Sequence, residues 1–231
     1  MLRKSSIALV AAMLVCASAQ AGPVLVLDQE NVVPGVPPAP SVISVQLGSG
    51  PEFAQTFTVG VGGVLAQIDL QLARFGSIPL VLDIRGTSAA GVPNGTVLTS
   101  VSIDPNTVVP WLPTPDWTLP FTSIVLGAAE ISVLAGEVLA ISLSQQVTLD
   151  DFYLWHVTGD LYSGGSTYGR NGPAAPFVPL SELFNQPAFF DVGFRTYVRT
   201  NDVPEPEVLA LAALALALAG GVRRRRAVTA L

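Results

Sequence analysis

The chain has 231 residues, of which half are apolar and only 12% are charged, so it is more apolar than an ordinary globular domain. This length allows one domain of moderate size together with terminal signals. Between Gly22 and Asp202 there are five arginines, no lysine and 15 acidic residues, which gives a net charge of −10. Such an acidic surface repels phosphate backbones, and we therefore expect no binding to nucleic acid.

Residues 1–21 have the three parts of a secretory signal peptide. Two basic residues precede a short apolar run over residues 7–15, and residues 19–21 form a small-residue cleavage pattern. The apolar run is too short to span about 30 Å of hydrocarbon, which argues against a permanent N-terminal anchor. We expect the export machinery to cleave the chain before Gly22. The only cysteine, Cys16, lies in this segment, so the exported domain would contain no disulfide bond or thiolate metal site.

Residues 22–200 contain short segments in which apolar and polar residues alternate, separated by Gly, Pro, Asn and Asp. In the clearest segment, Ala66, Ile68, Leu70 and Leu72 share one face. Residues 123–134 come nearest to a helical pattern, but their β-branched residues disfavour a helix. We predict an all-β domain over residues 22–200, a two-sheet sandwich of the jelly-roll type. Further strands are predicted over residues 53–59, 80–85, 96–103, 137–143, 153–157 and 192–198.

Few residues of this domain offer catalytic chemistry. His156 is the only histidine, and no serine lies in a nucleophile-elbow pattern, so a Ser-His-Asp triad would have to use His156. We prefer a structural position for His156, because a histidine metal centre needs further ligands. Asp150 and Asp151 form the only adjacent acidic pair; a solvated loop is preferred, and calcium binding by the loop is the alternative. We expect no catalytic residues and no other metal or cofactor.

Four aromatic residues are candidates for ligand binding. Tyr153 and Trp155 share one face of a predicted strand, and Tyr162 and Tyr168 flank the glycine-rich residues 163–167. If they are exposed, such rings stack on the apolar faces of sugars and would bind glycan. Similar rings more often complete the core of a sandwich, which is the preferred alternative.

The C-terminal residues 201–231 contain three consecutive parts. Residues 203–206, Val-Pro-Glu-Pro, include two prolines that cannot continue a strand or a helix interior. Residues 208–222 are uncharged and dominated by alanine and leucine, which predicts a transmembrane helix of about 22 Å. The four arginines at residues 223–226 hold the following end in the cytoplasm, so the β domain lies outside. The length of the helix leaves a permanent anchor and a temporary signal both open.

This order of parts resembles the PEP-CTERM sorting signal of bacterial exported proteins. The resemblance covers residues 203–226 and is specific in order, spacing and chain position. It implies recognition by an exosortase, a membrane transpeptidase-like enzyme, with processing near the Pro-Glu-Pro. It also implies an inner-membrane intermediate and a final place at the cell surface or in an extracellular matrix, often one rich in exopolysaccharide. The residues that carry the resemblance are Pro204, Glu205, Pro206, Arg223, Arg224, Arg225 and Arg226.

The β domain has a resemblance of its own. Residues 55–58, 134–137, 162–165 and 194–198 resemble landmarks of extracellular choice-of-anchor domains, which implies a β-sandwich on the cell surface and no known catalysis. We therefore expect a non-enzymatic envelope or matrix protein whose sandwich binds glycan or exopolysaccharide, or has a structural role. The alternative is a secreted carbohydrate-active hydrolase or lyase, and it rests on fold analogy alone.

Overall fold

The computed structural model describes residues 22–32, 45–47, 51–111, 119–127, 130–144, 151–159, 161–185 and 190–200. Leu25–Arg199 form one compact unit, which holds the described core. The predicted signal peptide and sorting tail lie outside the described residues, and so does the predicted transmembrane helix. Within the described ranges, no helix has the length and apolar character needed to cross a membrane.

The described secondary structure consists of strands and two short helical turns. One sheet contains β1 (Val24–Asn31), β2 (Val45–Leu47), β4 (Gly63–Phe75), β7 (Phe121–Val125), β8 (Ile131–Val133), β10 (Phe152–Trp155) and β15 (Phe194–Thr200). The other contains β3 (Pro51–Thr58), β5 (Leu80–Thr87), β6 (Pro93–Ile103), β9 (Val138–Ser144), β12 (Thr167–Asn171) and β13 (Val178–Pro179). A small ladder joins β11 (Val157–Gly159) to β14 (Phe190–Val192), and the helical turns are η1 (Pro105–Thr107) and α2 (Leu180–Leu183).

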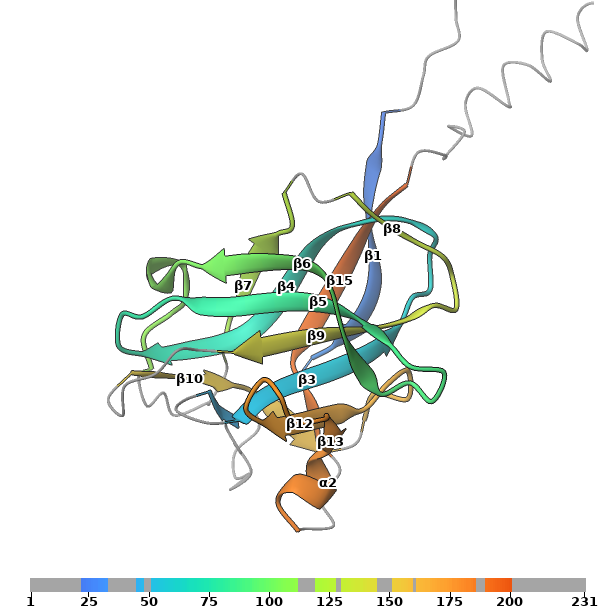
Figure 1. Cartoon of the computed structure of the whole chain (residues 1–231). Coiled ribbons are helices and arrows are strands. Elements are labelled where there is room, and N and C mark those ends of the chain that lie inside the picture. Colours follow the sequence, from blue (N-terminus) through green and yellow to red (C-terminus); the bar gives the residue numbers. More distant parts are fainter. Residues whose placement is uncertain are drawn as a thin grey trace, which may run out of the picture. The chain divides into compact units, whose positions relative to one another are not determined.

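Two antiparallel sheets form the compact unit (Figure 1). The seven-stranded sheet has the order β1-β15-β4-β10-β2, and β7 and β8 also pair with β4. The six-stranded sheet has the order β13-β12-β3-β9-β5-β6. The prediction of an all-β domain with two sheets is confirmed, and the jelly-roll type stays a prediction. The segment that came nearest to a helical pattern in the sequence, residues 123–134, contains the end of β7 and all of β8.

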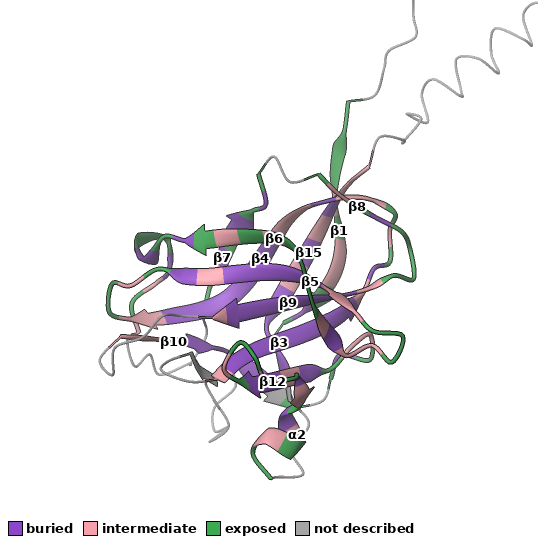
Figure 2. Cartoon of the chain, viewed as in Figure 1, coloured by how far each residue is buried: buried purple, intermediate pink, exposed green. Residues whose placement is uncertain are grey.

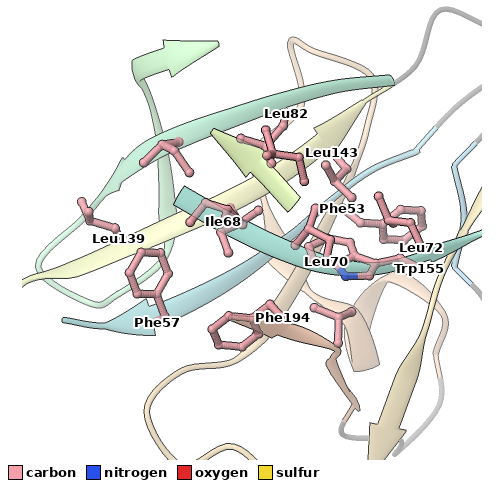
Figure 3. Packing of buried hydrophobic residues seen from close by; sticks show 14 of the residues in the cluster. Phe53, Phe57, Ile68, Leu70, Leu72, Leu82, Leu139, Leu143, Trp155 and Phe194 are labelled. Carbon is pink, nitrogen blue, oxygen red and sulfur yellow. The ribbon is translucent and has the colours of Figure 1, made fainter. Parts of the chain in front are cut away.

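Alternation along the strands determines which side chains enter the core between the sheets. In β4, Ile68, Leu70 and Leu72 are fully buried, as the pattern predicts. The prediction for Ala66 is wrong, because the register with β15 shifts at this point and Leu65 is buried in its place. Side chains of the six-stranded sheet meet those of β4 from the opposite side (Figure 3). The labelled core residues are Phe53, Phe57, Ile68, Leu70, Leu72, Leu82, Leu139, Leu143, Trp155 and Phe194.

Candidate functional site

Three of the four aromatic residues predicted to bind ligand lie in the core. Tyr153 and Trp155 on β10 are 1% and 0% exposed, and Tyr162 is 8% exposed. Their polar atoms are satisfied inside the domain: the Tyr153 hydroxyl donates to the Ile78 carbonyl at 2.9 Å, and Trp155 Nε1 donates to the Gly193 carbonyl at 3.1 Å. These positions contradict an exposed platform and correspond to the alternative, in which the rings complete the sandwich core.

Tyr162 is the one of these residues whose pKa is shifted most strongly by its surroundings. Its hydroxyl donates to Gln29 Oε1 at 3.0 Å, and its ring meets Phe194 edge-on with 5.0 Å between centroids. Desolvation by burial, reinforced by the carboxylates of Asp28 and Asp191, raises the pKa of Tyr162 to about 12. The ring is therefore held neutral in a packed position between β1 and β15.

Tyr168 is separated from the other three aromatic residues. Its neighbour Gly169 faces the core, because a Cβ there would lie 3.3 Å from Phe53 Cδ1. Tyr168 therefore points outward on β12, where it lies opposite Ala54 of β3 and is half-buried. Burial raises its pKa as well. Of the four predicted residues, Tyr168 alone keeps a position that a ligand could reach.

His156 lies where three segments of chain meet. Three backbone hydrogen bonds close a ring: His156 N donates to Gln71 O at 3.0 Å, Gln71 N to Gly193 O at 3.1 Å, and Gly193 N to His156 O at 2.8 Å. A side chain at Gly193 would force a shift, because its Cβ would lie 2.9 Å from Gln71 Cβ. His156 thus occupies the point at which β10 leaves β4 and continues as β11 toward β14.

The imidazole of His156 has an environment that favours its neutral form. The residue is 2% exposed, and desolvation lowers its pKa below the ordinary value. Its Nδ1 has no hydrogen-bond partner among the residues that the structure describes. The burial of the ring at a strand junction supports a structural position for His156.

Asp151 fastens a turn. Its Oδ1 accepts a hydrogen bond from Ser77 N at 2.6 Å, just after the end of β4. Gly76 has a φ of +100° and lies so close that a Cβ would overlap the Asp151 carboxylate. Asp150 lies outside the described residues, so calcium binding by this acidic pair stays a prediction. In the described part of the chain, no group of three or more His, Cys, Asp or Glu side chains could hold a metal ion.

The outer face of the six-stranded sheet carries a buried charged cluster that the sequence reasoning missed. Glu52 on β3 lies between two arginines: Arg170 Nε donates to Glu52 Oε2 at 2.8 Å, and Arg85 Nη2 lies 3.0 Å from Glu52 Oε1. The second contact is an ion pair without an aligned hydrogen bond. Arg85 also bonds to Asp83 Oδ2 at 2.6 Å and to Ser142 Oγ at 2.8 Å.

An aromatic ring covers this cluster. The centroid of Phe177 lies 4.5 Å from Arg170 Cζ and 5.9 Å from Arg85 Cζ, which places both guanidinium groups in cation–π range. Arg170 Nη1 donates to the Pro173 carbonyl at 2.8 Å, so the segment before β13 is tied to the sheet. Because the two cations and two anions of the cluster pair with each other, we interpret the cluster as a structural fastening of this segment.

A second group of rings lies on the outer face of the seven-stranded sheet. Phe75 at the end of β4 stacks on Phe152 of β10, with 4.2 Å between centroids and 20° between planes. Trp111 lies 5.9 Å from Phe75, and its backbone N–H donates to the Arg74 carbonyl at 2.9 Å. The three rings are half-buried and rest on a small apolar cluster that includes Leu154. These partly accessible rings are candidates for ligand binding in place of the buried Tyr153, Trp155 and Tyr162.

Residues 202–226 match the PEP-CTERM protein-sorting motif. The match includes the Pro-Glu-Pro and the four arginines, and it confirms the resemblance of the tail. The chain therefore carries a sorting signal that implies processing by an exosortase-type enzyme and export to the cell envelope or surface. No curated protein matches the chain. The sorting motif lies outside the described residues, and the resemblance of the β domain to choice-of-anchor domains stays a prediction.

Proposed function

We propose that this protein is exported, held in the inner membrane by its C-terminal helix, and then processed and placed on the cell surface or in an extracellular matrix. The observation that carries the proposal is the sorting motif at residues 202–226. In this reading the apolar residues 208–222 span the membrane, and the arginines that follow remain in the cytoplasm. The protein would interact first with the export machinery, then with the membrane, and finally with an exosortase-type enzyme.

The distance between the folded domain and the processing site is limited by the chain. β15 ends at Thr200, and Pro204 follows four residues later. Four residues span at most about 14 Å when fully extended. The processing enzyme therefore acts close to the last strand of a folded sandwich.

Mass spectrometry of the mature protein from its native host tests the sorting proposal. We expect a chain that begins at Gly22 and ends near Pro206. Glu205→Ala should cause the uncleaved form to accumulate in the membrane, whereas the control Glu207→Ala, at a carboxylate outside the Pro-Glu-Pro, should be processed normally. A mature protein that still contains residues 208–226 would show that the tail is a permanent anchor.

We further propose that the sandwich is non-enzymatic and binds matrix polysaccharide through the rings of Phe75, Trp111 and Phe152. Support comes from their stacked, partly accessible arrangement and from their place on the outer face of a sheet. The outward faces and edges of these stacked and tilted rings offer apolar surface against which sugar units can pack. The acidic composition of the domain is compatible with a neutral polymer.

A pull-down with exopolysaccharide from the native host tests the binding proposal. Phe152→Ser should weaken binding severalfold, and Phe184→Ser, at a phenylalanine that is 51% exposed at the end of α2, should leave it unchanged. Equal binding by both variants would place the ligand elsewhere on the domain. If the unaltered protein binds no matrix polymer, a structural role for the sandwich remains.

A further inference from the structure

Among the residues that the structure describes, β6 forms an open edge of the six-stranded sheet. It pairs with β5 along one side and ends the strand order of the sheet. With 11 residues it is the longest of the four strands that end the two sheet orders, since β1 has 8, β2 has 3 and β13 has 2. Residues 95–98 in the first half of β6 are exposed, as are Ser100 and Ser102, and Figure 2 shows exposed segments along this strand. An edge of this kind presents unpaired backbone groups to a further strand.

Two other edges of the same molecule are protected against such pairing. β13 is short, ends in Pro179 and is followed directly by α2. β1 carries Asp28, whose Oδ1 accepts a hydrogen bond from Gly60 N at 2.8 Å, and Glu30, which pairs with Arg195 at 3.2 Å. Short length, proline and charge are the usual devices by which sheet edges avoid association.

β6 has few of these devices. No charged residue occurs between Gly86 and Ile103, and the single proline of the strand, Pro93, stands at its first position. Two irregularities interrupt the register with β5: one lies between Pro93 and Val97, and a bulge between Val97 and Thr99 leaves the intervening residue unpaired. The bulge precedes a regular run over residues 99–103, so the usable edge is about five residues long.

We propose that residues 99–103 of β6 pair antiparallel with the same residues of a second copy of the chain, across a two-fold axis near Val101. The two six-stranded sheets would then continue as one. Such an isologous pairing places Ser100 opposite Ser102 of the partner subunit, and cross-strand pairs of hydroxyl side chains are favourable. Thr99 and Ile103 would lie opposite each other on the core side of the joined sheet.

The charge distribution makes β6 a more favourable place for contact between two copies than the rest of the acidic surface. The region from Gly22 to Asp202 has a net charge of −10, so two copies repel each other in most orientations. Pairing through the uncharged β6 places no carboxylate opposite another. The contact is small, since about five residues per copy compare with 20–30 in a standard interface. The dimer should therefore form where copies are crowded and dissociate on dilution.

Cysteine cross-linking of the full chain in its exporting host tests the proposal. Cys16 is the only native cysteine and lies in the predicted signal peptide, so an introduced cysteine would be the only thiol of the exported domain. Among the single variants Ser100→Cys, Val101→Cys and Ser102→Cys, the yield of disulfide-linked dimer should have its maximum at Val101→Cys, because Val101 faces its own copy across the proposed axis, and a maximum at another position would contradict this register. The matched control is Ser123→Cys, at an exposed serine of β7.

A second variant tests the edge itself. Adding Ser100→Lys to the Val101→Cys variant places like charges at the edge and should lower the dimer yield at least fivefold, whereas adding Ser123→Lys should not change it. Absence of dimers from properly exported protein, equal yields from every exposed cysteine, or adducts with a different protein would each overturn pairing with a second copy. Mass spectrometry of the same samples shows independently whether the C-terminal tail has been processed, so failure of the dimer and failure of sorting can be told apart.

Discussion

Neutralising Glu52 gives the sharpest test of the charged cluster on the six-stranded sheet. Glu52→Gln keeps the size of the side chain and removes the charge that pairs with Arg85 and Arg170. Arg85 would retain Asp83, but Arg170 would be left with the Pro173 carbonyl as its partner. The change therefore leaves a buried guanidinium without a counter-ion, beneath the ring of Phe177.

The structure sets the expected size of this effect. The side chains of Glu52, Arg85 and Arg170 are 8%, 7% and 9% exposed, so solvent screens them little. Removal of one partner from a buried ion pair costs about 3–5 kcal/mol. In a domain of this size, each kcal/mol shifts the melting temperature by about 2–4 °C. We expect Glu52→Gln to lower the melting temperature by roughly 6–20 °C.

Thermal and urea unfolding of a soluble fragment over residues 22–200, which contains the described core, measures this loss. A quadruple variant with Glu52→Leu, Asp83→Asn, Arg85→Met and Arg170→Met, which removes both cations and both anions, should recover most of the stability, because replacing a whole buried ion group by uncharged side chains is often neutral. Glu130→Gln is the control, since its pair with Arg199 is exposed and should contribute at most about 1 kcal/mol. A Glu52→Gln fragment as stable as this control, or a quadruple variant less stable than the single one, would refute the reasoning.

Three further predictions concern the strand junction and the core. Burial lowers the pKa of His156 from its ordinary value of 6.5, so the unfolded chain takes up a proton before the folded one. The urea midpoint should therefore fall as the pH decreases from about 7.5 to about 5.5. His156→Gln, which removes the only histidine, should make the midpoint less dependent on pH in this range. An unchanged pH dependence in the variant would show that other groups cause the fall. Gly193→Ala should destabilise the domain by about 1–3 kcal/mol, because its Cβ would lie 2.9 Å from Gln71 Cβ, whereas Gly159→Ala has open space and serves as the control. Equal urea midpoints for these two variants would contradict the close packing. In an alkaline absorbance titration of the folded domain, Tyr162 should ionise only near pH 12, and Tyr162→Phe should remove that late step; complete ionisation of the tyrosines near their ordinary pKa of 10 would show that the ring is solvated.

The fold could be predicted from the sequence as far as alternation determines it. The pattern over residues 66–72 correctly indicated a strand with Ile68, Leu70 and Leu72 inside. It failed at Ala66, because the bulge there depends on the register with β15, a strand that lies far away in the sequence. The short helix α2 was not predicted either, since four residues are too few to show helical periodicity.

The candidate sites were less accessible to sequence reasoning. Alternation correctly placed Tyr153 and Trp155 on one face of a strand, but it could not show that this face is the one covered by the second sheet. Glu52 and Arg170 are 118 positions apart, and their pairing depends on the register between β3 and β12. The isolated charges on predicted strands, such as Asp83 and Arg85, were the available signal for a buried cluster.

The position of β15 has a mechanical consequence. This strand lies between β1 and β4, so it has a hydrogen-bonded ladder on each side. If the processed chain is attached to the surface through its C-terminal end, tension from the attachment enters the domain through Thr200, the last residue of β15. Both ladders would then be sheared at once, and their hydrogen bonds would share the force, whereas a strand peeled from one edge would lose its bonds one after another. The last strand before the sorting signal is thus placed where the sandwich best resists being pulled apart.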